Sequence, residues 1–566
     1  MKKFDFLIKS TAINSYSIFL FYHLQFFYTY IELIQISKKF TSNIIISLFI
    51  MKKSTLQNTF LSKLSRNEIT IEEALIDEST VIGVRRQSKI IIPFIIQNIS
   101  SILRIAVDIN SQFKHLSSKA MKIITTTNSG KLISAICDGK ELNSIAKEIE
   151  MMDINDDLEN HTHFTDDNRK TESSSNFEEK SEFLFDENIN YSTCYNNRKN
   201  AIIGRFAEIV EACILKYPES IYGFHFLMKF LKYSDNYTIF SLFENLASSK
   251  KEEIVSFLKF VKFQDRIIDI ISKWHRGDDF ISSDCAAALY QILIVFVDTS
   301  AIYQTSFSPK LIQFSLDYFE HADSDVLAKQ WKLAKTLVDA STVNDFATLY
   351  QTASISIEII SDTIFEYQIN AIDFIISLIT FSSPSLFQRA SSNQHKFSDD
   401  DENYQPIETK EFDENQQNDF LSSIDSDNLF SCATKIFESF PNSSIALATI
   451  CDLMLTSIMT EELRNNVIEI FFPVIIEGCQ SQTVSQRAFS IQFVKQVFDM
   501  CRNSNKSLQD EIEKHPYFIE IGMPIVFAND SILHREYGEI IGISSIIGCS
   551  TLETLNPIPK AFNVSV

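Results

Sequence analysis

The chain has 566 residues, of which 45% are hydrophobic, so it is long enough to bury several cores or to form one elongated repeat array. Its net charge of -22 argues against nonspecific binding to nucleic acid, because such binding needs Lys and Arg to displace the counterions of phosphate. Only 11 Gly and 11 Pro interrupt a sequence in which Ile, Leu and Phe recur at helical spacing. We therefore expect an all-α protein.

Residues 1–50 form an apolar N-terminal extension with three alternative interpretations. Within it, the run from Ser10 to Ile31 carries no charged side chain and is long enough to cross a bilayer. Its four Tyr side chains make it unusually aromatic for a membrane helix. The extension is either an upstream segment foreign to the native protein, which would then start at Met51, or a membrane anchor, or a packed helix.

Residues 51–152 are predicted to form the N-terminal helical part of the protein. The stretch from Phe60 to Thr80 indicates a short amphipathic helix, a tight turn and a second, acidic helix. Thr70 is followed three residues later by Glu73, which is the spacing of a capping box, in which both side chains bind the free amides of a helix start. The acidic side chains of this second helix complement its N-terminus or face water.

Two acidic inserts interrupt the helical pattern, at residues 153–197 and 390–418. Residues 151–200 carry 12 acids and 5 bases, and residues 394–419 carry 9 acids and 2 bases. Both inserts lack helical periodicity and are rich in Ser, Asn and acidic residues, so we expect disordered loops. The acidity of the protein therefore belongs to these loops and does not mark a folded face for a basic partner.

Around the second insert, residues 198–389 and 419–550 repeat one rhythm, in which helices of about 12 to 20 residues are separated by short turns. Antiparallel helix pairs of this length, stacked side by side, are typical of an α-solenoid. No single repeat motif recurs cleanly, so we predict an irregular armadillo- or HEAT-like array, followed by a tail at residues 551–566. The inserts interrupt this one array and need not separate independent domains.

The sequence contains no motif that indicates an active site. It lacks a phosphate-binding glycine loop, a dinucleotide-binding fingerprint, a zinc-protease helix and a serine-hydrolase elbow. Its nine cysteines are scattered singly without a C-x-x-C pair, so we interpret them as small core residues in a reducing compartment. His161 and His163 lie in a polar acidic stretch with no third ligand nearby. We therefore expect no enzymatic activity, no cofactor and no metal.

Several segments, taken in chain order, resemble one family, and together they span about residues 51–548. The stretch FLSKLSRNEITIEEALIDE resembles the start of the SAPS domain, with matching positions at Thr70, Glu72, Glu73, Leu75, Asp77 and Glu78. The stretch IFESFPNSSIALATI is similar to a later SAPS segment and retains Phe437, Phe440 and Pro441. The stretch REYGEIIGISSIIG, which contains Tyr537 and Gly538, lies where the family has the pattern R-x-G-Y-M-G-H.

The SAPS family comprises regulatory subunits of serine/threonine phosphatases of the phosphatase 6 type. The resemblance implies a non-catalytic helical scaffold that binds a phosphatase catalytic subunit and directs it to phosphoprotein substrates or further adaptors. It implies a cytoplasmic protein, with the nucleus as a second location. A membrane partner is expected only if residues 10–31 are an anchor, and nucleic acid is not expected.

The retained family positions are the candidate partner contacts: Asp77, Glu78, Phe437, Phe440, Pro441, Tyr537 and Gly538. The two Phe residues and Pro441 are also expected in the core or at a helix start, which is the more common place for such residues. The alternative function is that of a generic helical-repeat adaptor in trafficking or nuclear transport. Such an adaptor would account equally well for the solenoid, the acidity and the absent motifs.

Overall fold

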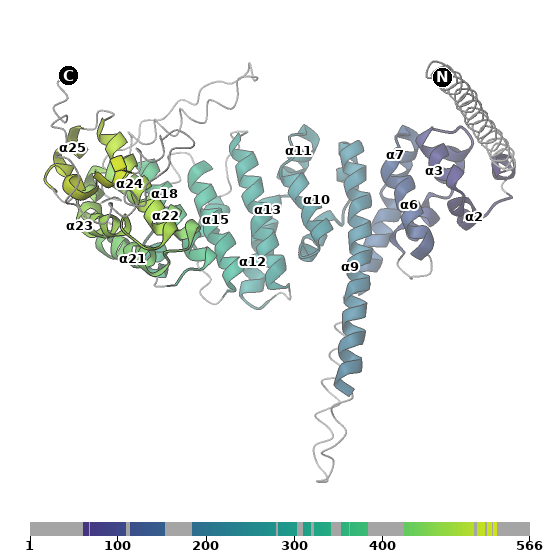
Figure 1. The fold of residues 1–566 in the computed structure, drawn as a ribbon. Coiled ribbons are helices and arrows are strands. Elements are labelled where there is room, and N and C mark those ends of the chain that lie inside the picture. Colours follow the sequence, from purple (N-terminus) through teal and green to yellow (C-terminus); the bar gives the residue numbers. More distant parts are fainter. Residues whose placement is uncertain are drawn as a thin grey trace, which may run out of the picture. The chain divides into compact units, whose positions relative to one another are not determined.

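The computed structural model describes most of the chain between residues 60 and 528. The gaps in that range are residues 67, 109–113, 153–183, 279–280, 303–308, 318–321, 341–352, 361–362, 383–420, 422–423, 503–505, 516–517 and 523. Every regular element in the described ranges is a helix, and these ranges contain no strand, so the predicted all-α class is confirmed (Figure 1). The following predicted features lie outside the described residues: the extension 1–50, the insert 390–418, the tail 551–566, Tyr537 and Gly538.

The chain divides into two compact units that interleave along the sequence. Among the described residues, the first unit comprises those between 60 and 152 and residues 208–223, and the second comprises residues 184–207 and those between 224 and 528. One helix, α9 (Leu184–Lys216), therefore contributes residues to both units.

Helix α9 begins earlier than the sequence predicts. The predicted disordered insert 153–197 extends over residues 184–197, which are in fact the first turns of this 33-residue helix. Lengthening an existing helix adds one hydrogen bond for each residue fixed, whereas starting a helix is costly. The buried turns around Phe206 and Val210 therefore allow the polar start of α9 to continue as helix. The remainder of the insert, residues 153–183, lies outside the described residues.

The first unit is built from short helices around an apolar core. They are α2 (Ile71–Ile76), α3 (Glu78–Arg85), α4 (Ile91–Gln97), α5 (Ile99–Val107), α6 (Lys114–Thr126), α7 (Gly130–Ile136), a helix over residues 140–152, the last turns of α9, and the 3-10 helix η1 (Pro218–Gly223). Helix α6 packs against α2, α3 and α5, and α4 packs against α3, α5 and α7. The predicted capping box is confirmed at α2, where Thr70 Oγ1 accepts from the Glu73 amide at 3.2 Å and the Glu73 carboxylate accepts from the Thr70 amide at 3.1 Å.

The second unit contains longer helices in a regular packing order. They are the 3-10 helix η2 (Leu227–Tyr233), α10 (Tyr237–Ala247), α11 (Glu252–Phe260), α12 (Phe263–His275), α13 (Ser283–Ile302), α14 (Pro309–Leu316), α15 (Ser324–Ala340), α17 (Ala353–Ile359), α18 (Glu366–Ser382), α21 (Ser426–Ser439), α22 (Ser444–Met459), α23 (Glu461–Gly478), α24 (Val484–Arg502), α25 (Lys506–Ile512) and the π-helical turn η5 (Phe518–Gly522). Helices α10, α13, α15, α18, α22 and α24 each pack against the next, and we call them the main row.

The helices between the members of the main row form a second layer. Helices α12, α14, α17, α21 and α23 pack respectively against α13, α15, α18, α22 and α24, and we call them the second row. Figure 1 shows the neighbouring members α13 and α15 side by side. Such stacking of adjacent helix pairs is the packing order of an α-solenoid, so the predicted solenoid-like fold is confirmed.

Helix α13 of the main row is apolar on most of its sides because other helices pack against several of them. Of the helices in the described ranges, α13 alone is long and apolar enough to cross a membrane, over Ser283–Ser300. Its Leu289, Tyr290 and Leu293 are fully buried, and it packs against α10, α12 and α15. This packing accounts for the apolar composition of α13, because a helix surrounded by others needs no polar face there.

A chain of aromatic rings joins the helices at the C-terminal end of the second unit. The ring of Phe471 on α23 lies 5.3 Å from Phe437 on α21 and 5.3 Å from Phe493 on α24, in edge-to-face geometry. The neighbouring Phe472 stacks on Phe518 of η5 at 4.5 Å. Phe471 is fully buried, so its ring connects the two rows through packing alone.

The substitution Phe471→Ala is expected to lower the free energy of unfolding of the second unit by about 3–5 kcal/mol, because it leaves a cavity where three rings meet. The control Phe260→Ala truncates a ring that is 78% exposed at the end of α11 and should change that free energy by less than about 0.5 kcal/mol. Urea denaturation followed by circular dichroism measures both variants. Equal losses in the two variants would contradict the structural role of the ring chain.

Candidate protein-binding surface

Two of the predicted partner contacts, Asp77 and Glu78, lie where one predicted helix is broken into two. Asp77 ends α2 and is also the N-cap of α3, and its carboxylate accepts a hydrogen bond from the Ser79 amide at 2.7 Å. Glu78 is the first residue of α3 and is exposed. The capping bond is enough to explain why position 77 is an aspartate, so no contact with another protein is needed there. The side chain of Glu78 is accessible to a partner.

The predicted contacts in the second unit differ in accessibility. Phe437 is fully buried in the ring chain, so it cannot touch a partner, and its role is to hold α21 against α23. Phe440 is the C-cap of α21, and Pro441 lies in the turn before α22; both are half-buried. Phe440 and Pro441 therefore stay candidate contacts, and Tyr537 and Gly538 lie outside the described residues.

The exposed side of the main row carries charged side chains on four successive helices. We call these residues the charged stripe: Asp298 on α13, Lys332, Lys335 and Asp339 on α15, Asp373 on α18, and Asp452 on α22. The spacing of three and four residues on α15 places its three charges on one helix face. Lys335 Nζ contacts Asp339 Oδ2 at 2.7 Å, within that face.

Hydrogen bonds between row members set the register that brings these charges together. Lys329 Nζ of α15 donates to Gln291 Oε1 of α13 at 3.1 Å. Asn370 Nδ2 of α18 donates to the Ala328 carbonyl of α15 at 2.9 Å. These bonds lie near the N-terminal halves of the helices, so the following turns, which carry the charged stripe, are also adjacent.

Three carboxylates of the charged stripe, those of Asp298, Asp373 and Asp452, are less favourable when ionised than they would be in water. Partial burial raises the pKa of Asp298, and the nearby Asp339 raises it further. Partial burial also raises the pKa of Asp373; Lys335 opposes this shift, while Asp452 and Asp339 add to it. Partial burial raises the pKa of Asp452 as well. A cationic side chain from another protein would stabilise the ionised forms, so the charged stripe is suited to recognising a protein surface.

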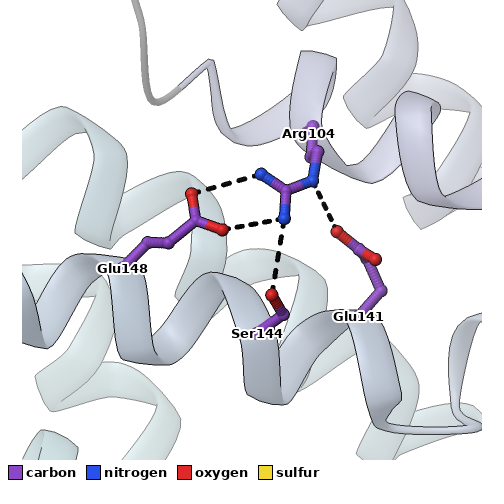
Figure 2. A network of polar contacts seen from close by, with 4 residues as sticks. All are labelled: Arg104, Glu141, Ser144 and Glu148. Atoms are coloured by element: carbon purple, nitrogen blue, oxygen red, sulfur yellow. Dashed lines mark hydrogen bonds and ion pairs between the residues drawn. The ribbon is translucent and has the colours of Figure 1, made fainter.

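A second polar network, centred on Arg104 of α5, is used inside the chain. Its Nε donates to Glu141 Oε1 at 2.6 Å, and its terminal nitrogens donate to both oxygens of Glu148, at 2.7 and 3.2 Å, and to Ser144 Oγ at 3.4 Å (Figure 2). The hydrogen bond to Glu148 is the main reason why the pKa of Arg104 is raised. The guanidinium therefore fastens α5 to the helix over residues 140–152.

In the part of the chain that the structure describes, no group of three or more His, Cys, Asp or Glu side chains could hold a metal ion. The residues of the charged stripe were not identified from the sequence, because each of the four helices contributes only one to three of them. The spacing on α15 alone signals a charged face.

Two thiols that are far apart in the chain and belong to no C-x-x-C motif act on each other's pKa. Cys213 lowers the pKa of the Cys137 thiol, whereas Cys137 and burial raise the pKa of the Cys213 thiol.

Comparisons with known proteins place the chain in no family. No family model matches it, and no curated protein matches it. One similar solved structure is the crystal structure of an engineered protein, which is 10% identical and aligns over 81% of this chain and 98% of its own, with a TM-score of 0.29. A likeness at this TM-score supports no conclusion on fold or function.

The pair Asp77→Ala and Glu78→Ala separates capping from partner contact. Asp77→Ala should lower the free energy of unfolding of the first unit by about 1 kcal/mol, because the Ser79 amide loses its acceptor. Glu78→Ala should change it by less than about 0.5 kcal/mol, because the side chain is exposed. Thermal and urea unfolding measure the difference, and an equal loss in both variants would contradict it.

The substitution Asp373→Asn is expected to raise the thermal midpoint of the second unit near neutral pH. Its folded pKa lies above the unfolded value, so the ionised carboxylate costs folding free energy above that folded pKa. The cost is lost as the pH falls through the folded pKa, and the two proteins should unfold alike below the unfolded value of about 3.9. Thermal melts over this pH range test the expectation. A lower midpoint for the variant at neutral pH would mean that Lys335 favours the carboxylate more than burial opposes it.

Proposed function

We propose that this chain is a non-catalytic scaffold that binds another protein along the exposed side of the main row. The observation that carries the proposal is the charged stripe, which crosses four successive helices with partly buried carboxylates. A stacked-helix array offers an extended surface on which a few anchoring side chains supply specificity. The carboxylates of Asp298, Asp373 and Asp452 are the anchors that a basic surface of the partner would meet.

The proposed partner is a serine/threonine phosphatase catalytic subunit, which the scaffold would direct to phosphoprotein substrates. This choice rests on the resemblance of residues 60–78 and 436–450 to segments of the SAPS family. The helix break at Asp77 and the exposed Glu78 are compatible with a contact in the first of these segments. Phe440 and Pro441 are the accessible retained positions of the second.

Affinity purification of the full-length chain from native lysate, with mass spectrometry of stoichiometric partners, tests the proposed partner. A serine/threonine phosphatase catalytic subunit recovered at near one-to-one ratio is the expected result. Transport factors or coat components, without a phosphatase, would overturn the phosphatase assignment and support a trafficking or nuclear-transport adaptor instead.

Charge reversal tests the surface. The double substitution Asp298→Lys with Asp452→Lys is expected to reduce recovery of the partner by about tenfold or more, because it replaces two acceptors by like charges facing a basic surface. The matched control is Glu469→Lys, which reverses an exposed charge on α23 of the second row and should leave recovery unchanged. Loss of the partner in the control alone would place the binding surface on the second row.

A further inference from the structure

Two contacts between α15 and α18 fix the direction and the register of these neighbouring helices. Asn370 Nδ2 of α18 donates to the Ala328 carbonyl of α15 at 2.9 Å. One turn further along both helices, the rings of Trp331 and Phe374 lie 5.6 Å apart. The two helices therefore run in the same direction, and these two rings lie at one level.

Three charged side chains lie near this level on three successive helices of the main row. Lys332 of α15 and Asp373 of α18 are the sequence neighbours of the two rings, so they lie side by side. Asp373 is near the middle of α18, Asp452 is near the middle of α22, and these two helices pack against each other. From α15 to α22, the exposed side of the row thus presents one ammonium group and then two carboxylates.

These three groups are available to another protein. Within the described part of the chain, Lys332, Asp373 and Asp452 make no hydrogen bond and no ion pair, whereas Lys335 of the same stripe is paired with Asp339 at 2.7 Å. Lys332 and Asp452 are exposed, and Asp373 is half-buried. The two carboxylates also disfavour each other's ionisation, and a cation placed between them would remove this repulsion.

The first unit shows how one guanidinium group binds two carboxylates at a similar separation. Glu141 and Glu148 are seven residues apart on one helix, which is about 10 Å along its axis. Arg104 donates to Glu141 at 2.6 Å and to Glu148 at 2.7 and 3.2 Å (Figure 2). Packed helices lie about 8–10 Å apart, so Asp373 and Asp452 can share one arginine in the same way. A lysine ammonium group lacks the planar fork of donors that this arrangement uses.

We propose that this face binds an α-helix of the partner protein, with an arginine that bridges Asp373 and Asp452 and a carboxylate seven residues away that meets Lys332. Seven residues of α-helix span about 10 Å, which matches the spacing of the main row, and they return to the same helix face. A helix also holds both groups in place before binding, so less entropy is lost than with an extended segment. The inference rests on the proposed scaffold function and names the group that the scaffold recognises.

Fluorescence anisotropy of labelled peptides, titrated with the full-length chain at low ionic strength, tests the proposal. The probe is a helical peptide of alanine and glutamine that carries one glutamate and, seven residues later, one arginine, and it should bind saturably. Replacing its arginine by the uncharged citrulline should reduce the affinity at least about tenfold, and replacing it by lysine at least about threefold. Equal binding of the arginine and citrulline peptides, or no saturable binding of the arginine peptide, overturns the proposal.

Variants of the chain locate the site. Asp452→Asn should weaken binding of the arginine peptide about tenfold, because one of its two acceptors loses its charge. The matched control Glu469→Gln changes an exposed side chain on α23 of the second row and should leave binding unchanged. Lys332→Glu should weaken binding of the same peptide and strengthen binding of a peptide whose glutamate is replaced by lysine. A loss of structure cannot produce this exchange of preference, and equal losses in Asp452→Asn and Glu469→Gln would contradict the assignment.

The outcomes separate this inference from the proposed function, because the peptides contain no phosphatase sequence. Binding of the arginine peptide without recovery of a phosphatase from lysate would overturn the phosphatase assignment and leave the arginine site in place. Recovery of a phosphatase that the double substitution Asp373→Asn with Asp452→Asn leaves undiminished would overturn the arginine site and leave the scaffold function in place.

Discussion

Each central member of the main row is buried on three sides. Helices α13, α15 and α18 each pack against the previous member, the next member and a helix of the second row. Burying one Leu, Ile or Phe side chain is worth about 1.5–3 kcal/mol, whereas an exposed ion pair such as that of Lys335 with Asp339 is worth about 1 kcal/mol at most. Apolar burial therefore holds the stack together, and the surface charges contribute little to its stability.

The fourth side of these helices is free from that packing requirement, and it carries the charged stripe. Carboxylates in this position are partly desolvated by the neighbouring helices, so their ionisation opposes folding. A protein keeps such residues at a small cost in stability where they serve recognition, because the same desolvation strengthens their attraction to a cation of a partner. Packing and proposed binding thus occupy different sides of the same helices.

Much of the fold follows from the sequence, because helix periodicity and caps are local properties. The capping box of Thr70 and Glu73 is encoded within four residues, and the helix-pair rhythm is visible without knowledge of distant contacts. Sequence similarity alone did not separate the buried Phe437 from the half-buried Phe440 three residues later, because both match the same family segment. Burial depends on which helix faces α21.

The features that the sequence did not predict depend on tertiary register. The start of α9 was missed because its polar turns are stabilised by packing further along the helix. The charged stripe requires the alignment of four helices, and the bonds of Lys329 and Asn370 join three of them, α13, α15 and α18.

The sharing of α9 between the two compact units has a consequence for the architecture of the polypeptide. The chain leaves the first unit, enters the second, returns for residues 208–223 and leaves again. No single cut of the backbone therefore releases either unit whole, and a fragment ending near residue 181 lacks residues 208–223 of the first unit. In evolutionary terms, neither unit can be duplicated or exchanged as one contiguous module, so the two units are expected to be inherited together.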